Sequence, residues 1–165
     1  MSEQGRAWIF GDNVSTDLIF PGRYVHLLSN MKELVQHTLE DARDDYAKNV
    51  KPGDFVVAGD NFGMGSSREQ APVIIKLSGA RAVLAKSFAR IFFRNAINVG
   101  LAAIEVDTDG IKEGDQLSVD LNAGKLIDHT SGIERTFEPL PKIMTDILAD
   151  GGLIEHIKKY GDFNL

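Results

Sequence analysis

Residues 54–78, which read DFVVAGDNFGMGSSREQAPVIIKLS, are the stretch that decides the fold. The run Asp54–Gly59 predicts a buried strand, and the glycines that follow turn the chain into a helix predicted from Ala71 to Ser78. Pro72 fits the first turn of that helix, where its missing N–H breaks no hydrogen bond. The stretch therefore predicts a strand, a glycine-rich turn and a helix, as in an α/β fold.

The same pattern repeats further along the chain. A second strand is predicted at Ala80–Ala85, a second helix at Phe88–Val99 with Gly100 as its stop, and a third strand at Leu101–Val106. Ser87 precedes the second helix and is interpreted as its N-cap. Two parallel strands whose carboxyl ends both lead into helices form a crevice for a ligand.

Smaller elements are predicted on either side, and we expect residues 1–165 to form a single domain because this length suits one core. In chain order they are a strand at Ala7–Phe10, an extended segment at Val14–Phe20, an amphipathic helix at Met31–Tyr46, a hairpin of Gln116–Leu121 with Lys125–Ile127, and a helical tail at Lys142–Tyr160 broken at Gly151–Gly152. The helix Met31–Tyr46 is predicted because apolar residues recur there every three or four positions.

The charge of the chain limits its partners. The formal net charge is −6, which argues against binding to nucleic acid or to a membrane surface, since both need a field that attracts phosphate. No apolar run approaches the ~20 residues of a membrane helix, and no apolar leader follows Met1, so we expect a cytoplasmic protein. An anionic ligand must be held by a few local donors.

Metal ligands are scarce in the sequence. The chain has no cysteine, which excludes cysteine-ligated zinc or iron–sulfur clusters on it. None of its four histidines has a partner at ligand spacing, and His37 falls on the predicted amphipathic helix, where it is expected at the surface. We therefore expect no metal site on this chain, and a metal that the reaction needs must come from elsewhere.

The segment Gly59–Gln70 is predicted to bind an anion. Backbone N–H groups at a helix start carry partial positive charge, Arg68 offers a planar fork for a carboxylate, and Ser66 and Ser67 offer hydroxyls. Its spacing does not match the dinucleotide fingerprint, the P-loop or the G-x-S-x-G elbow. Spacing alone equally fits a capping box, in which a serine caps the helix and Glu69 or Gln70 completes the box.

Three motifs together resemble one family. They are Gly11–Asp17 (GDNVSTD), Gly59–Gln70 (GDNFGMGSSREQ) and Ala85–Leu101 (AKSFARIFFRNAINVGL). In this order and spacing they resemble the swivelling domain of the aconitase superfamily, in the separate short form used as the small subunit of 3-isopropylmalate dehydratase or homoaconitase. The resemblance covers nearly the whole chain.

The resemblance implies a three-layer β/β/α domain, like domain 4 of aconitase, and a hydro-lyase that dehydrates and rehydrates a small dicarboxylate. This domain closes over a large partner subunit that carries a [4Fe–4S] cluster on three cysteines. One cluster iron binds the substrate's hydroxyl and a carboxylate as a Lewis acid. The lack of cysteine in this chain fits that division of labour.

Residue roles follow from the same resemblance. Ser66 takes the proton α to a carboxylate, Ser67 and Arg68 contact a substrate carboxylate, and Asp17 belongs to a hydrogen-bonding network with the partner. The remaining supporting positions are Thr16, Asn61, Gly63, Gly65 and Glu69. Two positions depart from the family pattern: Met64 replaces a common cysteine and Gln70 the usual histidine.

The loop Gly22–Leu28 bears on substrate choice. Its counterpart in aconitase and homoaconitase supplies an arginine to the distal carboxylate, and His26 stands at that position, flanked by Val25 and Leu27. A buried third carboxylate without a partner is penalised, so the loop favours an alkylmalate, with 3-isopropylmalate first. The loop is not the usual isopropylmalate version either, so dimethylmalate and citramalate stay open. Homocitrate also stays open, because a protonated His26 beside a carboxylate would replace the arginine in part.

Functions of other classes also stay open. Ser66, Ser67 and Arg68 could hold a phosphate or carboxylate in a non-catalytic regulatory module. A purely structural partner subunit would leave the glycine–serine–arginine run without a role.

Overall fold

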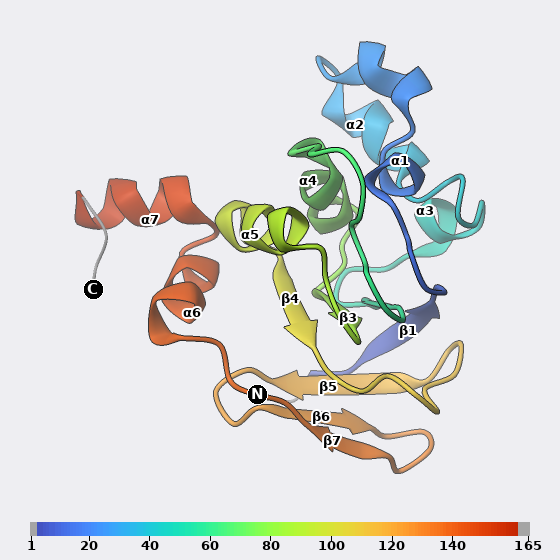
Figure 1. The fold of residues 1–165 in the computed structure, drawn as a ribbon, viewed down its shortest axis with the longest axis vertical. Helices are drawn as coiled ribbons and strands as arrows, with labels where there is room; N and C mark the ends of the chain where they lie inside the picture. Colours follow the sequence, from blue (N-terminus) through green and yellow to red (C-terminus); the bar gives the residue numbers. More distant parts are fainter. Residues whose placement is uncertain (1–2, 162–165) are drawn as a thin grey trace.

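The computed structural model describes residues 3–161 as one mixed sheet with helices (Figure 1). The strands are β1 Gly5–Ile9, β2 Phe55–Val57, β3 Ala82–Ala85, β4 Ala102–Glu105, β5 Gln116–Asp120, β6 Lys125–Asp128 and β7 Glu134–Thr136. The helices are α1 Thr16–Ile19, α2 Met31–Leu34, α3 Tyr46–Asn49, α4 Gln70–Leu77, α5 Arg90–Val99, α6 Lys142–Ala149 and α7 Leu153–Tyr160, with 3-10 turns η1 Gly22–Leu27 and η2 Val35–His37.

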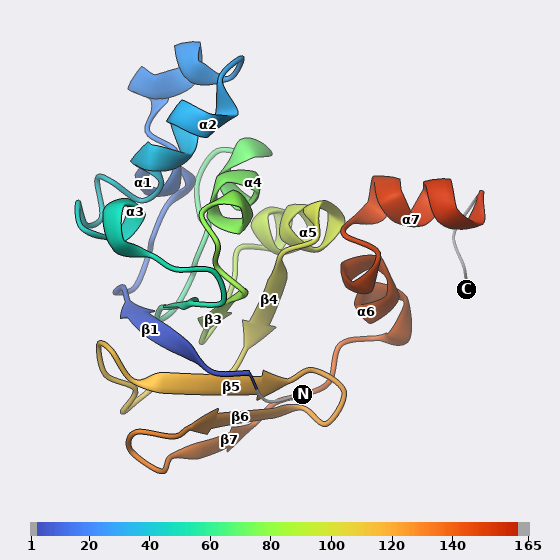
Figure 2. The same cartoon turned by 180° about the vertical axis from the view of Figure 1, so that it is seen from behind.

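The sheet has two parts with different directions. Its order is β4-β3-β2-β1-β5-β6-β7, parallel from β4 to β1 and antiparallel from β1 onward. In both views α4 and α5 lie on one side of the parallel strands, and the β5–β7 part curls beneath the other side (Figures 1 and 2). This arrangement is the expected three-layer β/β/α fold.

The parallel strands are buried on both faces, as their uninterrupted apolar sequences require. One face carries the row Trp8, Val56, Val83 and Ala103, which are register partners across the four strands and belong to the core beneath the helices. The opposite face packs on β5 and β6 through residues such as Phe55. Each layer of the fold is therefore joined to the sheet by its own apolar core.

The strands β1 to β6 and the helices α4 to α7 lie where the sequence predicts them. One prediction is wrong and one strand was not predicted. The segment Val14–Phe20 is not extended: it contains α1, because the Ser15 side chain accepts a hydrogen bond from the N–H of Leu18 and caps a short helix. The short strand β7 was missed, since Glu-Arg-Thr carries no apolar alternation.

The predicted helix Met31–Tyr46 is also wrong as a continuous element. It ends after η2, where Thr38 takes a non-helical ψ of 124° and Leu39 a φ of 58°. The N–H of Leu39 donates to the carbonyl of Ile19, 3.0 Å away, so a tertiary contact replaces the helical bond. The apolar periodicity correctly indicates buried residues, since Leu34 and Tyr46 are both buried. They are buried by a series of short turns, however, and not by one helix.

Two buried carboxyls meet beneath the antiparallel layer. Asp115 hydrogen-bonds Asp128, and this contact together with burial raises the pKa of Asp115. Burial would raise the pKa of Asp128 as well, but hydrogen bonds from Asp115 and from the backbone N–H groups of Ser131 and Thr130 lower it. Among residues 3–161, no N–H donor reaches Oδ2 of Asp128. The pair is therefore best satisfied when Asp115 keeps its proton.

We expect Asp115→Asn to stabilise the protein at neutral pH. An acid whose pKa is raised on folding stabilises the native state below its unfolded pKa and loses that contribution as pH rises through the folded pKa. An amide keeps the acceptor for the N–H of Lys112 and always offers N–H to Asp128. Urea unfolding from pH 4 to 8 should show a gain of about 1 kcal/mol at pH 7 that shrinks toward pH 4. A variant less stable than the parent at every pH would contradict this account.

Candidate active site

The glycine–serine–arginine loop borders a cavity at the carboxyl ends of the parallel strands. The loop leaves β2 and enters α4, and the cavity between it and the start of α5 has a volume of about 210 Å³. The residues that line it are Thr16, Gly63, Gly65, Ser66, Ser67, Arg68, Ala89, Arg90, Ile91, Phe92 and Asn95. The structure thus brings the first and second motifs together with the start of the third.

The loop is fixed by close backbone contacts. Gly63 has a φ of 83°, and a Cβ there would lie 2.2 Å from the ring of Phe92, so only glycine fits. The N–H of Gly63 donates to the carbonyl of Val14 at 2.7 Å, and the N–H of Thr16 to that of Met64 at 2.9 Å. Gly65 also has a positive φ, 96°. The segment before α1 and the side chain of Phe92 therefore set the path of the loop.

Thr16 contacts the backbone of Ser66 directly. Its hydroxyl donates to the backbone carbonyl of Ser66 at 2.7 Å, and the residue is 3% exposed. Because the donor is buried, this bond ties the backbone of Ser66 to the start of α1. Thr16 is therefore a positioning residue for this loop.

We expect Thr16→Val to reduce kcat about 10-fold with a small change in KM, because the serine loses its fixed position while the carboxylate-binding groups stay. Stability should fall by about 1 kcal/mol. The matched control is Thr108→Val, since Thr108 is also buried and donates to a carbonyl, that of Ala58, at 2.8 Å. It should lose similar stability at unchanged kcat. Equal kinetic losses in both variants would show that Thr16 acts only through stability.

Asn61 fastens the start of the loop. It has a φ of 62°, its N–H donates to the hydroxyl of Ser87 at 2.7 Å, and its side-chain amide donates to Asn13 at 3.3 Å. The prediction that Ser87 caps the second helix is wrong: α5 has Ala89 at its N-cap, and Ser87 ties neighbouring loops together. The first and third motifs thus support the second.

The two serines do not cap α4. The helix begins at Gln70, and Glu69 occupies the N-cap position without a side-chain hydrogen bond to the helix. The side chains of Ser66 and Ser67 are exposed and bond to no other described residue. Within residues 3–161, the backbone N–H groups of residues 65–69 also donate no hydrogen bond. Capping therefore does not explain the motif, whereas a row of free donors suits an anion.

Arg68 lies between the loop and the neighbouring 3-10 turn. Its guanidinium is 2.9 Å from Asp17 and lies 5.6 Å from the ring centroid of Phe20. Its Nε is buried without a hydrogen-bond partner in the described part of the chain. Asp17 itself is exposed, so the pair faces solvent on one side. The remaining donors of the planar fork can receive a carboxylate there.

The turn η1 begins beside this arginine, because a Cβ on Gly22 would lie 3.5 Å from Nη2 of Arg68. Arg23 binds Asp41 in a bidentate ion pair and also reaches Glu40. The hydroxyl of Tyr24 donates to Glu40. These contacts fix η1 before any ligand arrives.

The two carboxylates that hold η1, Glu40 and Asp41, are kept ionised by their hydrogen bonds. The hydrogen bond from Tyr24 is the main cause of a lowered pKa at Glu40, and the bond from Arg23 lowers the pKa of Asp41. The ring of Tyr24 stacks on His37, with centroids 3.9 Å apart, so His37 is half-buried rather than at the surface. The contacts of Arg23 with Glu40 and Asp41 therefore persist at neutral and mildly acidic pH.

The three predicted residues of this loop differ in placement. Val25 is 54% exposed and His26 is also exposed, with its Nδ1 3.1 Å from the carbonyl of Arg23. Leu27 is buried in the core under the helices. Val25 and His26 are thus the side chains of η1 that are free to face a ligand or a partner.

Five residues of the cavity, Ala89, Arg90, Ile91, Phe92 and Asn95, were not predicted as part of the site. Arg90, Ile91 and Asn95 line it from the first turns of α5. Their sequence pattern is that of a helix, and their residue types gave no direct sign that they border the serine loop. The fold, by placing the start of α5 against the serine loop, provides that sign.

No group of three or more histidine, cysteine, aspartate or glutamate side chains suited to a metal occurs among residues 3–161. In the same range, no helix has the length and apolar character needed to cross a membrane.

A β/β/α domain with serine and arginine on such a loop is of the swivelling class found in aconitase-type enzymes. The chain belongs to the family of the aconitase C-terminal domain, whose model matches residues 10–109.

Named relatives agree over nearly full length. The chain is 57% identical to 3-isopropylmalate dehydratase small subunit 2 of Archaeoglobus fulgidus, covering 100% of both chains. It is 51% identical to the methanogen homoaconitase small subunit of Methanothermobacter thermautotrophicus, covering 94% of this chain and 91% of that one. A crystal structure of 3-isopropylmalate dehydratase from Methanocaldococcus jannaschii matches with a TM-score of 0.92 at 46% identity, covering 98% of this chain and 96% of that one.

Proposed function

We propose that this chain is the small subunit of a cytoplasmic, [4Fe–4S]-dependent hydro-lyase that interconverts isomers of an alkylmalate, with 3-isopropylmalate as the leading substrate. The observation that carries this proposal is the cavity in which Ser66, Ser67 and Arg68 meet the free N–H groups of their own loop. Relatives that are 50 to 57% identical and bear the small-subunit name support it. A large partner subunit is part of the same proposal.

Ser66 is the proposed base. Its hydroxyl is exposed and its oxygen is not engaged by another described residue, so it can approach a carbon-bound hydrogen. A serine alkoxide needs local positive potential, which the N–H groups of residues 65–69 and the nearby guanidinium of Arg68 supply. The proton leaves the carbon α to a carboxylate and arrives at Oγ of Ser66.

Arg68 and Ser67 are proposed to hold one substrate carboxylate. The ion pair with Asp17 keeps the guanidinium in place at 2.9 Å, and the packing against Phe20 limits its rotation. Thr16, Asn61, Gly63, Gly65 and Glu69 are assigned to support of the loop. Orientation by a rigid fork is the main contribution of this chain to proton abstraction.

The cluster is proposed to lie on the large subunit. This chain does not fit it, because it has no cysteine and its described residues offer no other metal-binding group. When bound, an iron of such a cluster acts as a Lewis acid toward the substrate's oxygen ligands. The isolated small subunit should therefore be inactive.

The loop η1 is proposed to select the substrate's alkyl group. It begins beside Arg68 and presents Val25 and His26. Its own arginine, Arg23, is engaged by Asp41 and Glu40. A third carboxylate would lack a bidentate partner there, which favours 3-isopropylmalate over homocitrate. The 51% identical homoaconitase subunit makes homocitrate the second candidate.

An anaerobic assay tests the proposal. The chain is mixed with the cluster-loaded large subunit encoded in its own organism, and alkene hydration is followed by ultraviolet absorbance with substrates derived from isopropylmalate, dimethylmalate and homocitrate. We expect activity only in the mixture and highest kcat/KM for the isopropylmalate series. A clear preference for the tricarboxylate would overturn the substrate assignment, and a phosphate ligand bound tightly by the small subunit alone would favour a regulatory module.

A further inference from the structure

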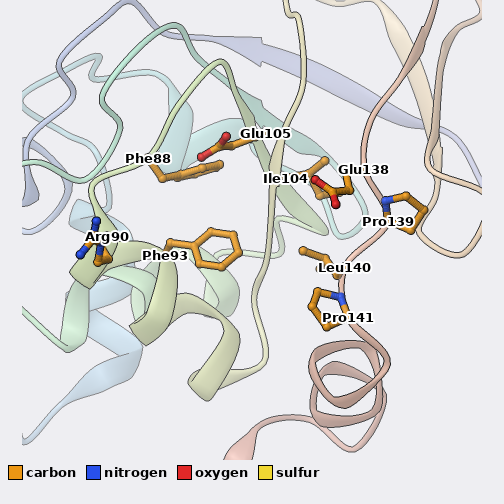
Figure 3. A pocket seen from close by; sticks show the side chains of 9 residues that line it. All are labelled: Phe88, Arg90, Phe93, Ile104, Glu105, Glu138, Pro139, Leu140 and Pro141. Atoms are coloured by element: carbon orange, nitrogen blue, oxygen red, sulfur yellow. The ribbon is translucent and has the colours of Figure 1, made fainter.

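A second cavity lies next to the serine loop. It has a volume of about 850 Å³ and lies between the start of α5, the end of β4 and the segment 138–141 that precedes α6 (Figure 3). We call it the α5 groove, and its lining residues are Phe88, Arg90, Phe93, Ile104, Glu105, Glu138, Pro139, Leu140 and Pro141. None of the catalytic roles proposed above uses this groove apart from its border with the serine cavity.

The groove has an apolar floor with walls of fixed shape. Phe93 and Leu140 point toward one another across it, and Phe88 lies beside Glu105 at one side (Figure 3). The ring of Phe88 stacks parallel to that of Phe92, which fixes its position. Two prolines border Leu140, and proline restricts backbone motion. A preformed apolar groove of this size suits an inserted side chain of a partner.

The charges at its rim have no partners. Among residues 3–161, Arg90, Glu105 and Glu138 form no ion pair or hydrogen bond through their side chains. The two glutamates line the same groove, whereas Arg90 stands at the end where α5 begins (Figure 3). An occupant that brings a lysine or arginine to the glutamates and an apolar side chain to Phe93 would match this distribution.

The groove is continuous with the proposed active site. Arg90 lines both cavities, and its neighbour Ile91, which is 52% exposed, lines the serine cavity. Both cavities open near the carboxyl ends of the parallel strands. A subunit that covers Ser66 must therefore also meet the surface next to it.

We infer that the α5 groove is a docking site for an extended segment of the large subunit, carrying an aliphatic or aromatic side chain for Phe93 and Leu140 and a basic residue for Glu105 and Glu138. This inference rests on the proposed function, which supplies the partner. It adds the place on this chain where that partner is held when the site closes. Binding at the groove would align the serine loop without contacting Ser66.

Charge reversal tests the inference. The double variant Glu105→Lys/Glu138→Lys should bind the cluster-loaded large subunit at least ~10-fold more weakly by biolayer interferometry, because two attractive contacts become repulsive. Leu140→Ser should weaken it by about 5-fold through lost apolar contact. The control double variant Asp44→Lys/Glu155→Lys makes the same change in net charge on other surfaces and should bind within about 2-fold of the parent. Circular dichroism and thermal unfolding verify that every variant is folded.

The outcomes separate this inference from the proposed function. Parent-like affinity of the groove variants in a complex that is active would overturn the groove and leave the function standing. A tight parent complex that is weakened by the groove variants but has no hydro-lyase activity would overturn the function and support the groove. Equal weakening by both double variants would reduce the effect to net charge and overturn the groove, and so would groove variants that change only self-association of this chain in sedimentation velocity.

Discussion

Ser66→Ala should lower kcat on the order of 10³-fold while KM and the affinity for the large subunit stay near their parent values. The hydroxyl is the only group lost, and because it bonds to no other described residue, its removal leaves the loop in place. The carboxylate-binding groups also remain, so substrate binding persists. Steady-state kinetics of the anaerobic mixture, together with a binding measurement, give both quantities.

A control for this substitution is Ser131→Ala, which removes an exposed hydroxyl that accepts a hydrogen bond from the N–H of Ile133 in the turn before β7. It should change kcat by less than about 2-fold. Ser67→Ala, one residue from the proposed base, should instead raise KM by about 10-fold, as expected for loss of a ground-state contact. Full activity of Ser66→Ala would remove this residue from the chemistry and reassign the loop to binding alone.

Arg68→Lys should lower kcat/KM by about 10²-fold, although the charge is retained. Lysine lacks the rigid fork with which arginine can contact Asp17 and a substrate carboxylate together. Its ammonium also lacks the flat guanidinium that lies 5.6 Å from the ring centroid of Phe20. The loss should appear largely in KM, and the free energy of unfolding should change by less than about 1 kcal/mol because the pair is partly exposed.

Arg81→Lys serves as the control for that change. Arg81 is an exposed arginine that pairs with Glu3 at 3.1 Å. It precedes β3 at the amino ends of the parallel strands, opposite to the loop, and its replacement should leave kcat/KM within about 2-fold. If both arginine variants lost activity to the same extent, the effect would be general and the assignment of Arg68 to the substrate would fail.

The elements that sequence predicted correctly are those whose signal is local. The strand, turn and helix around Gly59–Gln70 carry their own punctuation, with glycines at positive φ and Pro72 in the first turn of α4. Met31–Tyr46 failed because apolar spacing reports which residues are buried, not how the backbone connects them. The break at Leu39 depends on the carbonyl of Ile19, a partner twenty residues away.

The residues of the candidate site also fall into those marked by local sequence and those that depend on tertiary contacts. Ser66 and Arg68 stand out because a charge and hydroxyls in a glycine-rich turn are unusual, and the structure places both at one cavity. Other features of the site depend on contacts between distant segments. They are the contact of Arg68 with Gly22, the hydrogen bond from Thr16 to Ser66 and the position of Arg90 in the cavity wall. Such relations follow from the sheet order, which periodicity does not specify.

The contact between Gly63 and Phe92 determines how the serine loop responds to mutations in the core. The ring of Phe92 fills the place that a side chain on Gly63 would occupy, so the loop bearing the serine rests on an aromatic group of α5. Phe92 is 2% exposed and stacks with Phe88, which lines the α5 groove. A substitution at Phe92 that only repacks the interior would therefore move the serine. In this part of the core, mutations should lower kcat before they lower the free energy of unfolding enough to unfold the protein.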